Sequence, residues 1–173
     1  LKGLAMIPQE ELRHVLHGSH PGEQPTGAGL VRIRLVSSAP ADVLARSREV
    51  MRVVLETSDT PWPTAARWTE LLPEWFVREC APDDPAAEQT WLEQWRGLDA
   101  AGRSRAEQQK RWTLESWLSW LEPDEREWFW WDASVADSEG AVVVDVPGWP
   151  APFGALGWLL RASGAASVEV LDG

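Results

Sequence analysis

Residues 128–146, which read WFWWDASVADSEGAVVVDV, decide the fold of this chain. An aromatic and small-residue run over 128–136 and a β-prone run over 141–146 flank the connection Asp137-Ser138-Glu139-Gly140. Glycine readily takes the positive φ that short hairpin connections need, so the stretch predicts a β-hairpin. The alternative is a helix over 124–131, because Pro123-Asp124-Glu125 is also a typical helix start.

The segments on both sides of this hairpin complete an α+β pattern. Residues 30–36 alternate apolar side chains with Arg32 and Arg34, which is typical of a half-buried strand. We further expect a helix over 40–56, a helix over 153–162 and a strand over 166–171. The order β, α, β, β, α, β predicts a ferredoxin-like split βαβ sandwich, with two helices on one face of the sheet and the other face free.

The tryptophans are concentrated in one part of the chain. The sequence has thirteen tryptophans and no tyrosine, and eleven of the thirteen lie between Trp62 and Trp131. Helical spacing recurs through 61–123, as with Trp91 and Trp95, which are four residues apart. We therefore expect 61–123 to be a mostly helical insertion of about four short helices between the first helix and the second strand. Within it, residues 97–110 fit either a long loop or an exposed helix.

The N-terminal part differs in composition from the rest. A loosely amphipathic stripe predicts a short helix over 8–17, and the Gly- and Pro-rich residues 18–29 predict a linker. We accordingly divide the chain into this segment, 1–29, and an α+β domain, 30–173, that contains the insertion. The helix is expected to dock on its own chain, and a homo-oligomer remains an alternative.

Charge and cysteine content narrow the class of partner. The net charge is −11, and residues 61–139 hold seventeen acidic and eight basic residues, a net charge of −9. Such a field repels phosphate backbones, which argues against nucleic-acid binding. No apolar stretch reaches the ~20 residues that a membrane span needs, and no stretch reads as a signal peptide. With a single cysteine, Cys80, an internal disulfide is impossible, so we expect a cytoplasmic protein.

Alternation along the expected strands places a mixed set of side chains on the free face of the sheet. A surface of arginines, carboxylates and indoles can hold a planar or cationic ligand. The candidate binding residues on this face are Arg32, Arg34, Asp145 and Glu169, joined by Trp128, Trp130 and Asp132. Trp149, in the Gly148-Trp149-Pro150 loop, is a further candidate. The alternative is that the insertion folds back over this face, which the need to bury so many tryptophans favours.

No set of residues predicts catalysis or a metal site. His14, His17 and His20 recur every third residue, but no cysteine or carboxylate set completes a metal shell, so we expect solvent-exposed histidines. Cys80 has acidic neighbours, which disfavour a reactive thiolate. The acidic residues around Pro123 suit a helix start better than an acid–base pair. We therefore expect no catalytic residue, no metal and no cofactor.

These observations favour a non-catalytic binding protein. Its acidic, Trp-rich surface would engage a basic protein partner, with an antitoxin or immunity role as one example. The alternative is a small-molecule binder whose tryptophans line a pocket between insertion and sheet and take an aromatic or cationic ligand. An enzyme that uses carboxylates such as Asp132 and Asp145 is the weakest of the three hypotheses.

Overall fold

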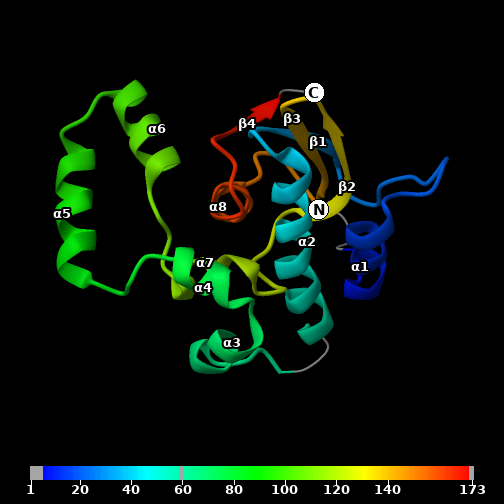
Figure 1. The fold of residues 1–173 in the computed structure, drawn as a ribbon, viewed down its shortest axis with the longest axis horizontal. Coiled ribbons are helices and arrows are strands. Elements are labelled where there is room, and N and C mark those ends of the chain that lie inside the picture. Colours follow the sequence, from blue (N-terminus) through cyan, green and yellow to red (C-terminus); the bar gives the residue numbers. More distant parts are fainter. Residues whose placement is uncertain (1–5, 59–60, 172–173) are drawn as a thin grey trace.

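The computed structural model describes residues 6–58 and 61–171, and this part of the chain forms an α+β fold with eight helices and one four-stranded antiparallel sheet (Figure 1). The strands lie in the order β2-β3-β1-β4, and each neighbouring pair is antiparallel. Their bounds are β1 (Gly29–Val36), β2 (Phe129–Ala136), β3 (Glu139–Val146) and β4 (Ser167–Leu171). Positions 1–5, 59–60 and 172–173, which include the ends of the segments 1–29 and 30–173, lie outside the described residues.

The hairpin predicted over 128–146 is confirmed, and the helical alternative for 124–131 is wrong. β2 and β3 pair along their length on either side of a tight turn. Asp137, rather than Gly140, takes the positive φ, at 55°, which Asp tolerates better than most residues. Gly140 instead lies in β3 opposite Leu35, where a Cβ would come within 3.1 Å of the Leu35 side chain.

The helices begin where the sequence supplies start signals. Proline occupies the first turn of α1 (Pro8–His17), α2 (Pro40–Thr57) and α5 (Pro85–Arg96). Capping side chains of Thr64, Asp84, Asp99 and Thr113 accept hydrogen bonds at the starts of α3 (Ala65–Leu71), α5, α6 (Ala100–Gln109) and α7 (Leu114–Leu121). The remaining helices are α4 (Glu74–Glu79) and α8 (Gly154–Ala162). The described part of 61–123 thus holds five helices rather than about four, because α6 forms within 97–110.

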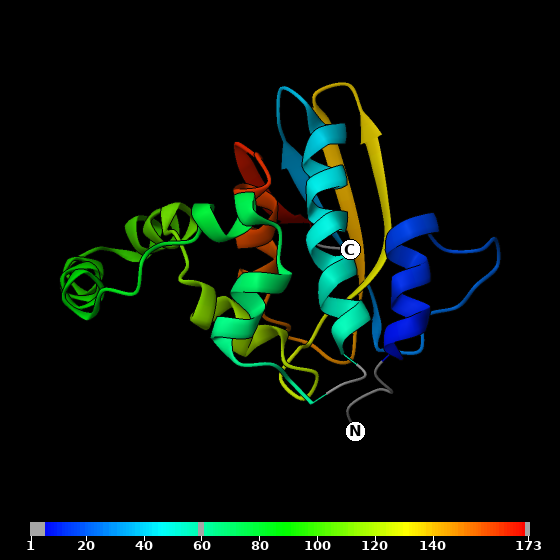
Figure 2. The same cartoon turned by 60° about the horizontal axis from the view of Figure 1, so that its bottom comes forward.

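The main core lies between the sheet and the helices α2 and α8, which cover one face of it (Figure 2). Ile33 and Val142 point into this core from the two central strands. Trp68, Phe76 and Trp117 extend the same core outward from α3, α4 and α7. These helices therefore pack on the side of α2 and α8, and the expectation that residues 61–123 fold over the opposite face is wrong. We call that opposite face, which carries Arg32 and Arg34, the open face.

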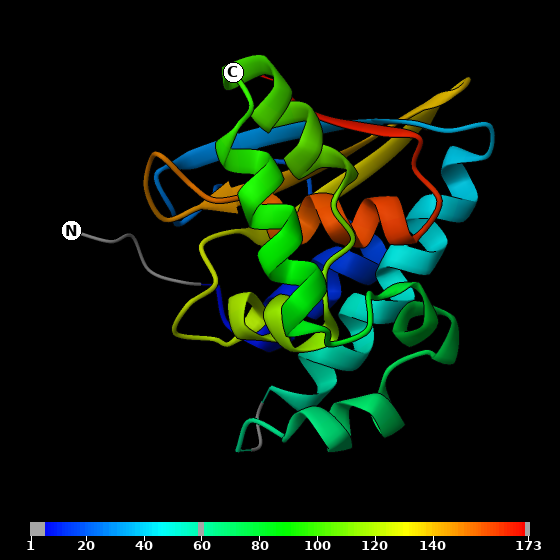
Figure 3. The ribbon, with the colours of Figure 1, turned by 90° about the vertical axis from the view of Figure 1, so that its left-hand side faces the viewer.

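The helix predicted over 8–17 is confirmed as α1, which packs against α2 and β2. Its buried side chains are Glu11, His14 and Val15. Because β2 is an edge strand, α1 covers one edge of the sheet. The other edge, β4, has a different neighbour: the helices α5 and α6 stand beside it (Figure 3).

Candidate functional site

Two of the predicted binding residues, Trp128 and Trp130, are in the core. Trp130 lies opposite Val144 and is fully buried on the α2–α8 side, and Trp128 is buried as well. The assignment of both indoles to the open face is therefore wrong. The reason is a β-bulge between Trp130 and Asp132, which inserts Trp131 as an extra residue and reverses the alternation for everything before it.

The predicted arginines and carboxylates do lie on the open face. Arg34 stands opposite Glu169 on the neighbouring strand, and its guanidinium forms ion pairs with Glu139 at 2.5 Å and with Glu169 at 3.3 Å. The pKa of Glu139 is lowered, chiefly by its hydrogen bond from Arg34. Arg32 is exposed beside this group. Exposed ion pairs of this kind contribute little to stability, so the open face is a solvated, self-paired charged surface around Arg34, whereas Phe129, Trp131 and Asp145 on the same face are buried.

Asp132 and Asp145 hold the linker against the sheet. Asp132 accepts a hydrogen bond from the Ser19 hydroxyl at 2.9 Å, and Asp145 accepts one from the Gly27 N–H at 3.1 Å. Gly27 is required there, because a Cβ would lie 2.4 Å from the Asp145 carboxylate and from the Val146 carbonyl oxygen. Burial raises the pKa of the Asp145 carboxyl. Both carboxylates thus have a structural role, which weakens the hypothesis of a carboxylate enzyme.

Trp149 is the most exposed of the tryptophans in the described residues. It lies in the loop between β3 and α8, and its ring is 6.3 Å from that of Phe153.

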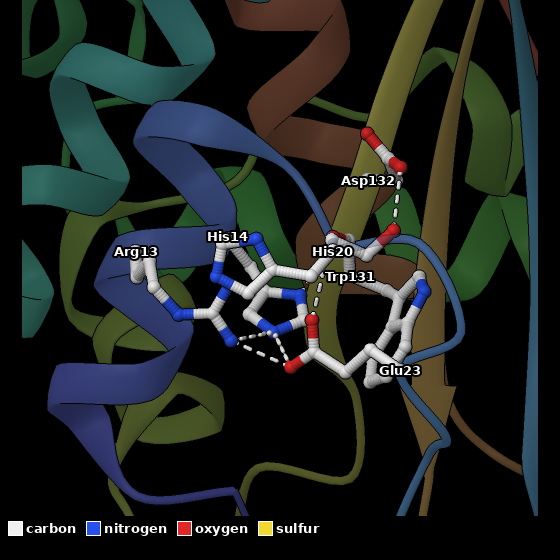
Figure 4. A network of polar contacts seen from close by, with 7 residues as sticks. Arg13, His14, His20, Glu23, Trp131 and Asp132 are labelled. Atoms are coloured by element: carbon white, nitrogen blue, oxygen red, sulfur yellow. Dashed lines mark hydrogen bonds and ion pairs between the residues drawn. The ribbon is translucent and has the colours of Figure 1, made fainter.

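A network that the sequence reading missed fastens the linker to α1 (Figure 4). The two ring nitrogens of His14 face the Trp131 carbonyl oxygen and a Glu23 carboxylate oxygen, each at 2.8 Å. Arg13 donates to the same Glu23 oxygen at 2.6 Å. The pKa of Glu23 is lowered to about 2, first by the His20 backbone N–H and then by Arg13 and His14. His14 is buried, so the expectation of exposed histidines is wrong at this position.

A buried ion pair joins α1 to the start of the hairpin. The Glu11 carboxylate receives two hydrogen bonds from Arg126, and it also accepts the Trp130 N–H at 2.8 Å. Glu11 is fully buried and Arg126 nearly so. Two hydrogen bonds from one guanidinium and a third from a backbone N–H compensate a buried carboxylate for the water it has lost. The residue types alone do not reveal this pair, since Glu11 and Arg126 lie 115 positions apart.

A wide cleft lies between the helices α5 and α6 and the edge of the sheet at β4 and α8. Its volume is about 1340 Å³. We call it the α5–α6 cleft. One wall carries Asp83, Glu88, Trp91, Glu107 and Lys110, and the opposite wall carries Phe153, Arg161 and the continuous run 166–170. None of the sequence-predicted residues except Glu169 lines it.

The two helices beside the cleft form a hairpin that leaves the body at a narrow neck (Figure 1). At the neck the Ala81 N–H donates to the Trp112 carbonyl at 2.8 Å, and Arg111 donates to the Glu79 carbonyl. None of the α5 side chains is buried. We call residues 82–110 the α5–α6 hairpin. Its helices pack against each other, and its indoles, Trp91 and Trp95, are half-buried and do not belong to the main core.

The hairpin tryptophans interact with each other and with cations. Trp91 and Trp95 are stacked, with ring centroids 6.4 Å apart. The Lys110 ammonium lies 4.2 Å from the Trp91 ring and the Arg103 guanidinium 4.4 Å from the Trp95 ring. These distances are typical of cation–π contacts. The two indoles thus already bind positively charged groups of their own chain.

The charge of the α5–α6 cleft is predominantly negative. Its lining contains five acidic side chains, Asp83, Asp84, Glu88, Glu107 and Glu169, and three basic ones, Arg105, Lys110 and Arg161. Both signs have partners: Glu88 pairs with Lys110 at 2.6 Å and Glu169 with Arg34 at 3.3 Å, while Arg161 donates to the Lys110 carbonyl at 3.0 Å, so the lining keeps an excess of two acids over bases. The cleft therefore offers a negative environment beside apolar and aromatic surface.

The described residues contain no group of His, Cys, Asp and Glu side chains that could hold a metal ion. Cys80 is buried, and burial raises the pKa of its thiol to about 11, so a thiolate does not form near neutral pH. Within the same residues, no helix is long and apolar enough to cross a bilayer.

A smaller pocket lies where 61–123 meets the body. Its volume is about 210 Å³, and its walls include Trp112, Trp120, Glu127 and Trp128. Glycine at position 154 leaves room for the Trp112 ring, because a Cβ at this position would come within 2.9 Å of that ring.

The chain matches no protein-family model, no curated protein and no solved structure.

Proposed function

We propose that this chain is a non-catalytic binding protein that engages a basic protein partner through the α5–α6 cleft. The observation that carries the proposal is the position of the α5–α6 hairpin. Helices in proteins gain most of their stability from packing an apolar face, yet α5 buries none of its side chains fully and leaves Trp91 and Trp95 half-exposed. A binding surface accounts for large aromatic side chains in such a place, because tryptophan anchors protein interfaces.

The negative charge of the cleft favours a positively charged partner. Complementary charge speeds association and excludes partners of the wrong sign. With five acids against three bases in the lining, and a net charge of −9 over residues 61–139, a basic segment is attracted and an acidic one repelled. The Lys110 and Arg103 contacts with Trp91 and Trp95 are an internal precedent for cations on these rings.

The scaffold of this binding surface is, on our proposal, a ferredoxin-like split βαβ sandwich with residues 61–123 inserted. Support comes from the strand order β2-β3-β1-β4 and from the helices α2 and α8, which follow β1 and β3 in the chain. Such scaffolds carry many unrelated functions, so the proposed function rests on the cleft and not on the scaffold. We also propose a cytoplasmic location, which suits a chain with one buried cysteine.

The test is direct binding of charged peptides to the whole chain. The probe is a fluorescein-labelled peptide of about nine residues, within the usual range of strand lengths, in which arginine and valine alternate. Its counterpart alternates glutamate and valine. We expect the basic peptide to bind, with an affinity that falls as salt screens the charges, and the acidic one not to bind. Equal binding of both peptides, or of neither, overturns the proposal.

Matched variants separate the cleft from the overall charge. Asp83→Asn with Glu107→Gln removes two charges from the cleft, and Glu93→Gln with Glu115→Gln removes two from exposed positions that do not line it. A Gln at 107 can still accept the Trp95 indole N–H, which Glu107 accepts at 3.1 Å. We expect the first double variant to weaken binding of the basic peptide by about tenfold and the second to leave it nearly unchanged. An equal loss in both variants contradicts a role for the cleft.

The smaller pocket supports a second candidate function, the binding of a small cationic or aromatic molecule. Three indoles and one carboxylate around about 210 Å³ are suited to a compact organic cation. Titration with tetramethylammonium, followed by intrinsic fluorescence, tests this. Saturable quenching that disappears in Trp120→Ala is the expected result, since Trp120 is exposed and lines the pocket. A spectrum that does not change with tetramethylammonium excludes this candidate.

A further inference from the structure

We infer that the basic partner segment binds as an extended strand along the free edge of β4, an inference that rests on the proposed function. The sheet order places β1 on one side of β4. Among residues 6–58 and 61–171, no strand lies on its other side. The lining of the α5–α6 cleft includes the consecutive residues 166–170, so the cleft follows β4 along the strand direction.

The β4 edge lacks two of the features with which proteins protect an edge strand. Ser167–Leu171 contains no proline and no lysine, both of which discourage pairing with another chain. The β2 edge, by contrast, is covered by α1. At β4 the α5–α6 hairpin stands beside the edge and leaves about 1340 Å³ between them, more than the ~300–1,000 Å³ of small-ligand pockets. The space suits a peptide segment better than a small molecule.

The side chains along β4 specify an alternating sequence for the occupant. Val168 and Val170 lie opposite Leu35 and Ile33, so they share the apolar side of the sheet, whereas Glu169 points to the open face. Val170 is 38% exposed, although its neighbour Ile33 is buried. A strand added beside β4 places every second side chain next to the valines and the others next to Glu169, whose carboxylate also pairs with Arg34 on the far side. The segment that fits has apolar and basic residues in alternation.

This mode of recognition makes a distinctive prediction about backbone N–H groups. In a two-stranded antiparallel or parallel pair, alternate N–H groups of the added strand point toward its partner. Two versions of the arginine–valine peptide are therefore made, with N-methyl groups on the odd or on the even residues. The unmodified protein is used throughout, so no variant can fail to fold. Binding is measured by fluorescence anisotropy, and amide hydrogen exchange of residues 167–171 is followed in parallel.

We expect one N-methylated peptide to lose at least about tenfold in affinity and the other to keep most of it. Exchange at β4 is expected to slow only with the peptides that bind. Equal affinity of both N-methylated peptides overturns strand addition and leaves the proposed function standing. A lack of binding by the unmodified basic peptide overturns both. A dimer of the chain that pairs its own β4 edges, detected by sedimentation and by slow exchange at β4 without peptide, also overturns the inference.

Discussion

The tryptophans of the body and those of the α5–α6 hairpin have the same chemistry and opposite environments. Trp68, Trp117 and Trp130 are fully buried in one continuous core. Trp91 and Trp95 stack on each other at the surface of a helix pair that buries none of the α5 side chains. In the first region the indole fills volume, and in the second it stays half-exposed and packs on another indole and on a cation of its own chain. Composition therefore does not tell whether a tryptophan-rich segment is a core or a surface, since this chain uses it as both.

The largest expected effect is in the body. Trp117 is fully buried, and its indole N–H donates to the Ala155 carbonyl at 3.0 Å. Replacing it by alanine leaves a large cavity and an unpaired carbonyl, so we expect Trp117→Ala to lower the free energy of unfolding by about 4 kcal/mol. Urea denaturation measures this. A loss below about 1 kcal/mol would mean that the indole is not part of a packed core.

The buried ion pair under α1 is expected to have the next largest effect. Arg126→Ala leaves the Glu11 carboxylate buried without its cation, which we expect to lower the free energy of unfolding by about 3 kcal/mol. The double variant Glu11→Gln with Arg126→Met removes both charges and keeps an acceptor for the Trp130 N–H. It is expected to be clearly more stable than the single variant. If the two variants are equally unstable, the charge pairing is not what fastens α1.

The hairpin is expected to tolerate the same kind of truncation. Trp91→Ala with Trp95→Ala removes two indoles from a surface, so we expect a loss below about 1 kcal/mol in unfolding free energy. The same variant is expected to weaken binding of the arginine–valine peptide, because Trp91 lines the cleft. The hairpin variant is thus expected to lose binding and keep its stability, whereas Trp117→Ala is expected to lose mainly stability. A large loss of stability in the hairpin variant would erase the difference between the two regions.

The smallest effect concerns the linker and depends on pH. The pKa of Glu23 is lowered from its ordinary value of 4.5 to about 2, so its charged form favours the docked linker. This contribution is complete above pH 4.5 and is lost as the pH falls toward 2. Amide hydrogen exchange within residues 18–28, expressed as protection relative to the unfolded chain at the same pH, is expected to lose protection over that range, while the body stays protected. In Glu23→Gln the linker should be poorly protected at every pH, and unchanged protection in the native chain down to pH 2 contradicts the docking role.

Much of the fold follows from patterns that are local in the sequence. The hairpin over 128–146, the strand around Arg32 and Arg34 and the proline-initiated helices all have short-range causes, such as alternation and turn chemistry. The positions of the candidate binding residues are predicted less well from the sequence. A single bulge at Trp131 reverses the faces of Trp128 and Trp130, and a bulge leaves no clear mark in an aromatic run.

The burial of particular side chains could not be predicted from the sequence. His14 is buried because Trp131 and Glu23 meet it from distant parts of the chain. The spacing of Trp91 and Trp95 resembles that of Trp117 and Leu121, four residues apart on one helix face. The two pairs differ in burial only because of long-range packing. Trp117 and Leu121 face α8 and the core, whereas α5 faces the cleft. The cleft itself joins residues 83–110 to residues 153–170, which no local pattern connects.

The most direct measurement is hydroxyl-radical footprinting of every tryptophan, read out by mass spectrometry with and without the arginine–valine peptide. Without peptide, Trp91 and Trp95 should be oxidised far faster than Trp68, Trp117 and Trp130, and Trp149 fastest of all, in line with their burial. With peptide, Trp91 alone of the two hairpin indoles should become protected, because it lines the cleft and Trp95 does not. Oxidation of Trp91 and Trp95 as slow as that of Trp117, or a footprint that the peptide leaves unchanged, would contradict an accessible aromatic surface built to meet another molecule.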